Sequence, residues 1–300
     1  MKKDLYKTCN LCPRNCGINR RQAVGRCGAG VEMTVARAAL HFWEEPPISG
    51  ERGSGTVFFS GCNLGCIYCQ NRQISRQAVG KKVTPAQLAA IFARLEGEGA
   101  HNINLVTPTH FRPSIMEAVA KFRNAGGKLP IVYNTGGYET IDSIRALQGT
   151  VDIYLTDLKY AERTSAAAFS KAADYPTVAR AALKEMVAAV GAPAFDEEGM
   201  LRKGVVVRLL VLPSIEHEAM MNLKWLKEQF GDQIIISLMN QYTPIGDGLP
   251  KELQKPLEES AYQSVVRYAR TLHFKYAYIQ EGETAKESFI PPFLEKEAIL

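Results

Sequence analysis

Residues 56–71 have the sequence TVFFSGCNLGCIYCQN, in which a short apolar run leads directly into a loop with three cysteines. The run at 56–60 is apolar on both faces, which is typical of a parallel strand buried between two layers. Similar runs follow it, separated from one another by helical patterns: INLVT (103–107), PIVYN (130–134), DIYLT (152–156), VVVRLLVL (205–212) and IIISLM (234–239). Six such units predict an α/β fold, a partial parallel (β/α)6 barrel, and 276–279 offers material for a seventh strand.

The first helix has the clearest boundary signals. Thr84 is placed to cap its N-terminus, Pro85 fits the first helical position, and Gln87 fits the capping-box position. Further helices are predicted at 113–125, 140–147, 176–190, 215–230 and 258–272. Composition divides the chain into a cysteine-rich metal-binding segment (1–50), the partial barrel (51–288) and a C-terminal arm (289–300).

The overall composition is that of an ordinary globular protein, with 46% hydrophobic and 22% charged residues among 300. The formal net charge of +5 is not gathered into a basic stripe, which argues against a nucleic-acid partner. No apolar stretch approaches the roughly 18 residues that a membrane-spanning helix needs, and no export signal follows the first lysines. The sequence therefore predicts a cytoplasmic protein without a membrane partner.

All seven cysteines lie within the first 69 residues. In a cytoplasmic protein they indicate metal binding or catalysis, because the cytosol keeps structural disulfides reduced. The loop after the first strand holds Cys62, Cys66 and Cys69, and three thiolates around a four-iron cluster leave one iron open to a further ligand. A zinc knuckle or a set of buried thiols is the alternative interpretation.

The C-x3-C-x2-C spacing, with Tyr68 before the last thiol, resembles the signature of the radical S-adenosylmethionine superfamily. Together with CPRNCGINR (12–20), it is most similar to homologues of pyruvate formate-lyase activating enzyme. The resemblance implies an oxidoreductase in which a 4Fe-4S cluster on Cys62, Cys66 and Cys69 is reduced by flavodoxin or ferredoxin. It then cleaves S-adenosylmethionine (SAM) to methionine and a 5′-deoxyadenosyl radical, which abstracts a hydrogen atom. In the activating enzymes the partner is a glycyl radical enzyme.

The resemblance also implies a SAM pocket at the carboxyl ends of the strands. Thr107, Thr109 and His110 stand where the family usually has a Gly-Gly-Glu stretch that binds the methionyl amine. The predicted cofactor contacts are Tyr68, Thr107, Thr109, His110, Asn134, Thr135, Asp157, Lys159, Arg208 and Gln241, with Asn240 and Tyr242 beside the last. Which residue replaces the missing glutamate stays open.

Several of these residues also have a plainer interpretation. His110 would suit a surface loop or a helix cap. Asp157 and Lys159 fall on the family's Asp-x-Lys pattern and share one face of a strand, but they would also form an exposed ion pair. Arg208 interrupts an apolar strand, where it either meets an anion inside or faces out among helix residues.

A second thiol set has the spacing Cys9-x2-Cys12-x3-Cys16-x10-Cys27. Three ligands within eight residues and a distant fourth favour an iron–sulfur cluster, with zinc or unmetallated thiols as alternatives. A cluster there would relay electrons to the catalytic one, whereas zinc would be structural. The nearby arginines either compensate thiolate charge or, as we expect, face solvent: Arg14, Arg20 and Arg21.

Three functions fit these observations. An activator of a glycyl radical enzyme needs an open barrel mouth that admits a peptide loop. A radical enzyme that modifies a small molecule or a peptide is favoured if residues 1–50 or 289–300 cap the mouth. A non-catalytic metal-binding protein is disfavoured by the polar residues at the strand ends.

Overall fold

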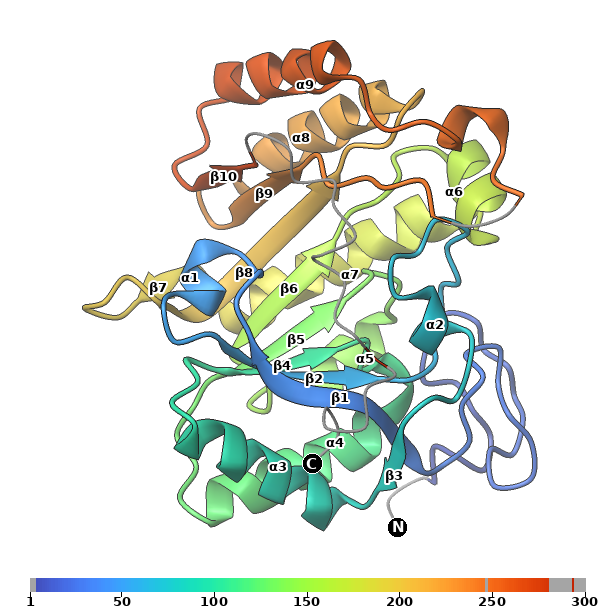
Figure 1. The fold of residues 1–300 in the computed structure, drawn as a ribbon, viewed down its shortest axis with the longest axis vertical. Helices are drawn as coiled ribbons and strands as arrows, with labels where there is room; N and C mark the ends of the chain where they lie inside the picture. The colour runs from blue at the N-terminus through green and yellow to red at the C-terminus, as the bar shows by residue number, and fades with distance from the viewer. Residues whose placement is uncertain (1–3, 246–247, 281–292, 294–300) are drawn as a thin grey trace.

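The computed structural model describes residues 4–245, 248–280 and 293. Its centre is one curved sheet with the strand order β10-β9-β8-β6-β5-β4-β2-β1-β3 (Figure 1). Along this order, all neighbouring strands from β10 to β2 pair in parallel, and the sheet stays open. The predicted α/β class, with a partial parallel barrel, is therefore confirmed.

The parallel strands occupy the apolar runs that the sequence indicates. Their bounds are β2 (Ser54–Phe59), β4 (Ile103–Val106), β5 (Ile131–Thr135), β6 (Ile153–Asp157), β8 (Leu201–Leu210), β9 (Ile235–Met239) and β10 (Ala277–Ile279). Every residue of β2, β4, β5 and β9 is buried, because helices cover one face and the site lies on the other. The seventh strand predicted at the C-terminal end is β10, which pairs with β9.

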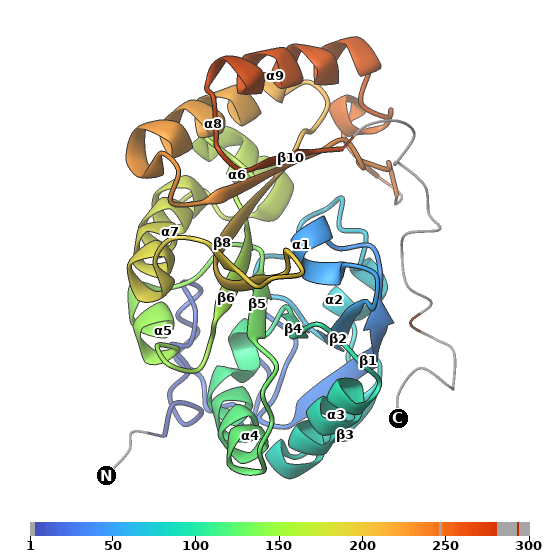
Figure 2. The same ribbon diagram turned by 90° about the vertical axis from the view of Figure 1, so that its left-hand side faces the viewer.

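Helices follow the strands and lie on the outer side of the sheet, where Figure 2 shows α5, α7 and α8 opposite α1. The main helices are α3 (Pro85–Gly97), α4 (Arg112–Asn124), α5 (Ile141–Ala146), α6 (Arg163–Ser170), α7 (Tyr175–Val190), α8 (Glu216–Phe230) and α9 (Glu259–Thr271). The capping box of α3 is present, with Gln87 N–H donating to the Thr84 hydroxyl and the Gln87 side chain accepting from Thr84 N–H. The short α6 was not predicted.

Strand β1 (Met33–His41) differs from the sequence expectation, because it lies within the segment set apart as 1–50. It pairs antiparallel with β2, from Val35 opposite Phe59 to His41 opposite Ser54, and with β3 (Lys81–Val83) on its other side. Its alanines and arginine give no β-branched run, so the strand forms through pairing with β2 rather than through local propensity. The segment thus contributes a strand to the main sheet.

The remaining elements are short: α1 (Pro46–Ser49), α2 (Arg72–Ser75), β7 (Ala194–Phe195) and the 3-10 turns η1 (Thr109–Phe111) and η2 (Lys251–Leu253). The predicted C-terminal arm at 289–300 lies outside the described residues except for Phe293, which is buried against Phe58. In the part of the chain that the structure describes, no helix has the length and apolar character needed to cross a bilayer.

Candidate functional site: a thiol and ion-pair pocket

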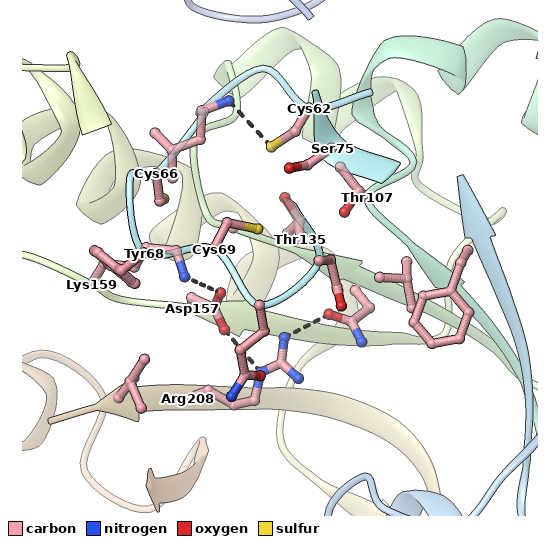
Figure 3. A pocket seen from close by; sticks show the side chains of 18 of the residues that line it. Cys62, Cys66, Tyr68, Cys69, Ser75, Thr107, Thr135, Asp157, Lys159 and Arg208 are labelled. Atoms are coloured by element: carbon pink, nitrogen blue, oxygen red, sulfur yellow. Dashed lines mark hydrogen bonds and ion pairs between the residues drawn. The ribbon is translucent and has the colours of Figure 1, made fainter. Parts of the chain in front are cut away.

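One pocket lies at the carboxyl ends of the parallel strands and contains about 1320 Å³ of space, part of it open to solvent (Figure 3). The sequence-predicted residues that line it are Cys62, Cys66, Tyr68, Cys69, Thr107, Thr109, Asn134, Thr135, Asp157, Lys159, Arg208 and Gln241. They come from the loop after β2 and from the ends of β4, β5, β6, β8 and β9. Parallel strands produce this convergence because their carboxyl ends meet at one edge.

The cysteine loop closes one side of the pocket. All three thiols are free; the Leu64 N–H donates to Cys62 Sγ at 3.4 Å, and the Ser170 hydroxyl to Cys66 Sγ at 3.0 Å. Burial raises the pKa of Cys62 to about 12, and the neighbouring thiols add to the effect. Without a metal Cys62 is therefore a neutral thiol, and a metal centre that binds it must displace its proton.

The opposite side of the pocket is a chain of charges. Lys159 Nζ lies 2.6 Å from Asp157 Oδ2, and Arg208 Nε lies 2.9 Å from Asp157 Oδ1. Arg208 Nη1 continues to Glu44 Oε2 at 3.2 Å, and Arg208 Nη2 donates to Asn134 Oδ1 at 2.6 Å. At most 16% of any of the four charged side chains is exposed. Arg208 therefore faces the pocket and not the helices.

These ion pairs determine whether the side chains of Asp157, Lys159 and Arg208 are charged. Burial alone would raise the pKa of Asp157, but the charges of Arg208 and Lys159 outweigh burial and hold that pKa below its ordinary value. Burial would lower the pKa values of Lys159 and Arg208, but the Asp157 charge raises both. All three groups are therefore charged at neutral pH.

Glu44 is a member of the site that the sequence analysis did not identify. Its Oε1 accepts from Asn104 Nδ2 at 3.1 Å and from Asn134 Nδ2 at 3.2 Å, beside its ion pair with Arg208. Burial raises its pKa and outweighs the opposing charge of Arg208. The residue precedes α1 in a Glu-Glu-Pro-Pro run with no motif signal, so only the fold places it in the pocket.

Glu139 is a second unpredicted acid, just behind the lining. Its Oε1 accepts hydrogen bonds from the hydroxyls of Thr109, Thr135 and Tyr133, and its Oε2 is buried without a hydrogen-bond partner among the residues that the structure describes. Burial raises its pKa to about 7. Glu139 thus orients two threonines that face the pocket and does not line the pocket itself.

Thr107 lies where the strand β4 ends and has a positive φ of 58°. A β-branched residue rarely adopts this conformation, and such strain is concentrated at functional sites. The Thr107 N–H donates to the Asn134 carbonyl at 2.9 Å, which fixes the turn at the pocket wall.

His110 was predicted to contact the cofactor, but the structure does not place it in the pocket. It is buried behind the cysteine loop, where its Nε2 lies 2.8 Å from the Ser60 carbonyl oxygen, and it is not among the lining residues. Burial lowers its pKa to about 4, so the ring is neutral. Tyr242 also turns away, donating to the Leu253 carbonyl, and Asn240 is not among the lining residues.

The N-terminal thiols form a second group beside the cysteine loop. Cys9, Cys12 and Cys27 are buried, Cys16 is half-buried, and all four are free. The predicted exposure of the nearby arginines holds for Arg21, of which 59% is exposed, but is wrong for Arg20, which is 2% exposed. Arg14 was also predicted to face solvent, but its guanidinium donates hydrogen bonds to four backbone carbonyls.

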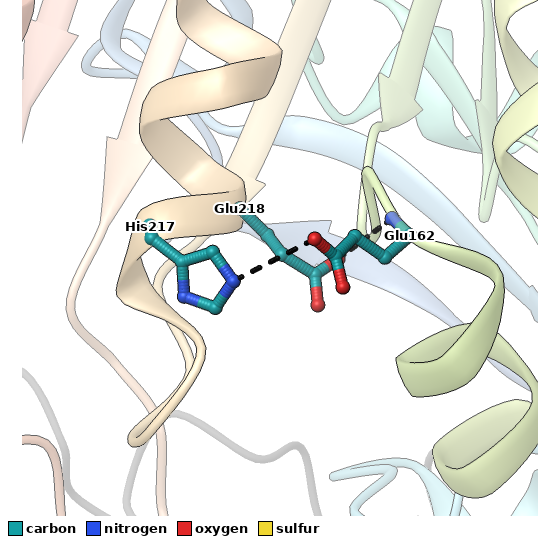
Figure 4. A group of neighbouring side chains, drawn as sticks. All are labelled: Glu162, His217 and Glu218. Atoms are coloured by element: carbon teal, nitrogen blue, oxygen red, sulfur yellow. Dashed lines mark hydrogen bonds and ion pairs between the residues drawn. The ribbon is translucent and has the colours of Figure 1, made fainter.

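A further group of metal-ligand side chains lies outside the pocket, at the starts of α6 and α8 (Figure 4). It comprises Glu162, His217 and Glu218, whose ligand atoms lie within 4.8 Å of one another. Glu162 and His217 are exposed, and Glu218 Oε2 already accepts the N–H groups of Ala161 and Glu162. We assign this surface cluster no part in the pocket.

The chain is similar to several known proteins in sequence or in fold. A 182-residue stretch covering 58% of the chain is 30% identical to an uncharacterized protein of Methanocaldococcus jannaschii, of which it covers 52%. The fold resembles HydG, a maturase of the FeFe hydrogenase (TM-score 0.52, 16% identity, 81% of this chain and 55% of that one). It also resembles Streptococcus suis SuiB bound to SAM (TM-score 0.50, 9% identity, 74% and 49%).

The chain spans about half the length of these relatives, and the likeness to the two solved structures is one of fold. Residues 56–189 match the family model described as the radical SAM superfamily. The match begins in β2 and ends in α7, so it includes the cysteine loop and the pocket residues at the ends of β4, β5 and β6. This part of the chain, residues 56–189, is therefore similar to the radical SAM superfamily.

Proposed function

We propose that the protein is a radical SAM enzyme that binds its cluster on Cys62, Cys66 and Cys69. The observation that carries this proposal is that the three thiols and the charge chain from Lys159 to Glu44 line the same pocket. A 4Fe-4S cluster bound there would supply the electron that cleaves SAM to methionine and a 5′-deoxyadenosyl radical.

The donor set suits such a cluster. Among the residues that the structure describes, no three cysteine sulfurs lie within 4.8 Å of one another. Thiolates that each bind a different iron atom stay further apart than thiolates around a single ion. Three thiolates would also leave one iron of the cluster without a cysteine ligand.

The charged residues suit the amino-acid end of SAM. Arg208 uses three of its five N–H groups in the network and Lys159 uses one of three, so both retain donors for a carboxylate. Asp157 and Glu44 would provide carboxyl oxygens that accept hydrogen bonds from the ammonium group. Because the four side chains hold one another in place, little ordering is needed when the ligand binds.

The test is formation of 5′-deoxyadenosine by protein reconstituted without oxygen, reduced with dithionite and mixed with SAM. We expect product from the wild type and none above background from Cys62→Ala, Cys66→Ala or Cys69→Ala. His217→Ala, an exposed change in the surface cluster, is the matched control and should keep the wild-type rate. An inactive wild type with a demonstrably reduced cluster would refute the proposal.

For the substrate, we propose a small molecule or a peptide rather than a glycine of a glycyl radical enzyme. Residues from the N-terminal segment, His41, Trp43 and Glu44, line the pocket. Phe293 of the C-terminal arm packs on Phe58, a lining residue, with 5.2 Å between ring centroids. Residues of both terminal segments therefore lie at or beside the pocket, and a closed site would protect a radical from water.

The two substrate classes differ in a direct measurement. Reduced protein and SAM are mixed either with candidate glycyl radical proteins or with fractionated metabolite and peptide extracts. We expect an extract fraction to stimulate 5′-deoxyadenosine formation, and no protein to gain a persistent glycyl radical by electron paramagnetic resonance (EPR). A glycyl radical signal would favour the activating function instead.

A further inference from the structure

The four N-terminal cysteines are gathered by local backbone contacts. The Cys9 N–H donates to the Ile18 carbonyl at 2.9 Å, and the Gly17 N–H to the Cys9 carbonyl at 2.9 Å, which folds 9–18 back on itself. The Arg26 N–H donates to Cys16 Sγ at 3.5 Å. A Cβ added to Gly25 would lie 3.5 Å from Cys27 Sγ and 3.7 Å from Cys16 Sγ. The distant fourth cysteine is thus brought to the other three.

The spacing of these sulfurs distinguishes the candidate metals. Around a tetrahedral zinc ion with Zn–S bonds of about 2.3 Å, all four sulfurs would lie about 3.8 Å apart. No three cysteine sulfurs in the described residues come within 4.8 Å of one another, in this set or in the catalytic loop. Among the described residues, neither set therefore has the close spacing that four thiolates around one zinc ion would require.

A buried arginine, Arg20, lies beside this set of thiols. The buried Arg20 guanidinium donates only to the carbonyls of Ala29, Gly30 and His110, and in the described part of the chain it has no ion-pair partner. It lies over the rings of Tyr6 and Phe111. A buried cation is costly without an anion, and four thiolates around a metal centre carry net negative charge.

The set is fastened directly to the catalytic loop. The Cys62 N–H donates to the Cys27 carbonyl at 3.2 Å, so one hydrogen bond joins a ligand of each set. Arg14, between Cys12 and Cys16, donates to the carbonyls of Asn63 and Leu64 in the loop and of Ser170 and Lys171 beside it. The closest approach is at Gly61, where a Cβ would lie 2.6 Å from the Cys27 oxygen.

We propose that Cys9, Cys12, Cys16 and Cys27 bind an iron–sulfur cluster rather than zinc, and that this cluster passes electrons to the catalytic one. A low-potential donor of the flavodoxin or ferredoxin class is oxidised by one electron, which reduces the N-terminal cluster. That cluster is reoxidised when the electron moves to the centre on Cys62, Cys66 and Cys69. The relay rests on the proposed function of that centre, whereas the identity of the N-terminal metal does not.

The first experiment identifies the metal in two complementary variants. One replaces Cys62, Cys66 and Cys69 with alanine, and the other replaces the four N-terminal cysteines. Both carry Glu162→Ala and His217→Ala, so that zinc on the surface cluster is not mistaken for zinc on the thiols. We expect about eight iron atoms per chain with all cysteines present and about four in each variant, with matching sulfide.

Zinc without iron in the variant that keeps only the N-terminal thiols would overturn the proposal. That variant alone decides the metal if the other fails to fold by circular dichroism. Iron and sulfide there, with no SAM cleavage by the wild type, would leave the N-terminal cluster standing and remove the proposed function. Zinc in the variant that keeps only the N-terminal thiols, with a wild type that cleaves SAM, would overturn the N-terminal cluster and leave the proposed function standing.

The second experiment tests the relay by EPR of the fully reduced proteins. Two reduced clusters joined through Cys27 and Cys62 should couple magnetically, so the wild-type signal should be broadened or split relative to the sum of the two variant signals. A wild-type spectrum equal to that sum, with about two unpaired electrons per chain, would show that the centres are too far apart and would overturn the relay.

Discussion

The Glu139 carboxylate is buried, and its Oε1 holds the hydroxyls of Thr109 and Thr135 at the pocket wall. Its pKa is raised by burial from an ordinary 4.5 to about 7. Between these two values the unfolded chain has lost the proton that the folded protein keeps. Ionisation therefore favours unfolding, and this contribution to stability is present below about pH 4.5 and lost as the pH rises through 7.

We expect Glu139→Gln to remove this pH dependence. Relative to the variant, the free energy of unfolding of the metal-free wild type should fall by about 2 kcal/mol between pH 5 and pH 8. Urea unfolding at both pH values measures the difference. Parallel pH profiles for the two proteins would contradict the assignment of a raised pKa to this residue.

Arg208 is the centre of the charge chain, since it contacts Asp157, Glu44 and Asn134. Arg208→Met would leave two buried carboxylates without their shared cation, which typically costs about 3 kcal/mol. Arg145→Met removes an exposed pair with Glu185 and should cost less than about 1 kcal/mol. Urea midpoints of both variants test this ordering, and equal losses would show that the pocket pair is screened like a surface pair.

At the scale of elements, the cysteine-rich segment is held to the rest of the molecule by strand β1 and by individual hydrogen bonds. Strand β1 pairs with β2 on one side of the segment, and Arg14 fastens the thiol-bearing loop to 63–64 and 170–171. The loop 9–28 has no regular helix or strand, so its position depends on these contacts and on any metal that it binds.

Arg14→Gln should loosen this loop without unfolding the sheet, because a glutamine cannot reach four carbonyls at once. We expect at least about tenfold faster proteolysis or amide exchange within 9–28, since the lost bonds to a charged group are worth about 1.5 kcal/mol or more. Exchange in β4, β5 and β6 should stay unchanged. Arg21→Gln, which removes an exposed pair with Asp4, is the control. Similar exchange in the two variants would show that Arg14 does not fasten the loop.

At the scale of the whole molecule, the pocket joins segments from most of the chain, from His41 to Gln241. A ligand that binds there stabilises every strand that contributes a contact, because it binds the folded state and not the unfolded chain. Ligand binding should therefore raise the free energy of unfolding of the whole protein, and this effect can be measured independently of activity.

We expect SAM at about 100 times its dissociation constant to stabilise the reconstituted protein by about 2.7 kcal/mol. Anaerobic thermal unfolding with and without SAM measures this, with adenosine, which lacks the amino-acid end, as the control ligand. Asp157→Asn should reduce the SAM shift. An equal shift with adenosine would show that the charge chain does not bind the methionyl group.

The local patterns of the sequence were sufficient to predict much of this molecule. The parallel strands, the capping box of α3 and the cysteine loop after β2 depend on residues close together in the chain. The strand order then brings the predicted residues at the strand ends into one pocket, since parallel strands place their carboxyl ends at one edge. His110 was misplaced because its strand-end position does not fix the direction of its side chain.

Tertiary structure alone decided the features that depend on distant parts of the chain. Glu44 meets Arg208 across 164 positions, Arg14 reaches Lys171 across 157, and β1 exists as a partner for the open edge of β2. No short window of sequence contains both members of such a contact. Burial then determines their chemistry: the same carboxylate group keeps a low pKa in Asp157, beside two cations, and has a raised pKa in Glu139, which no cation pairs directly among the described residues.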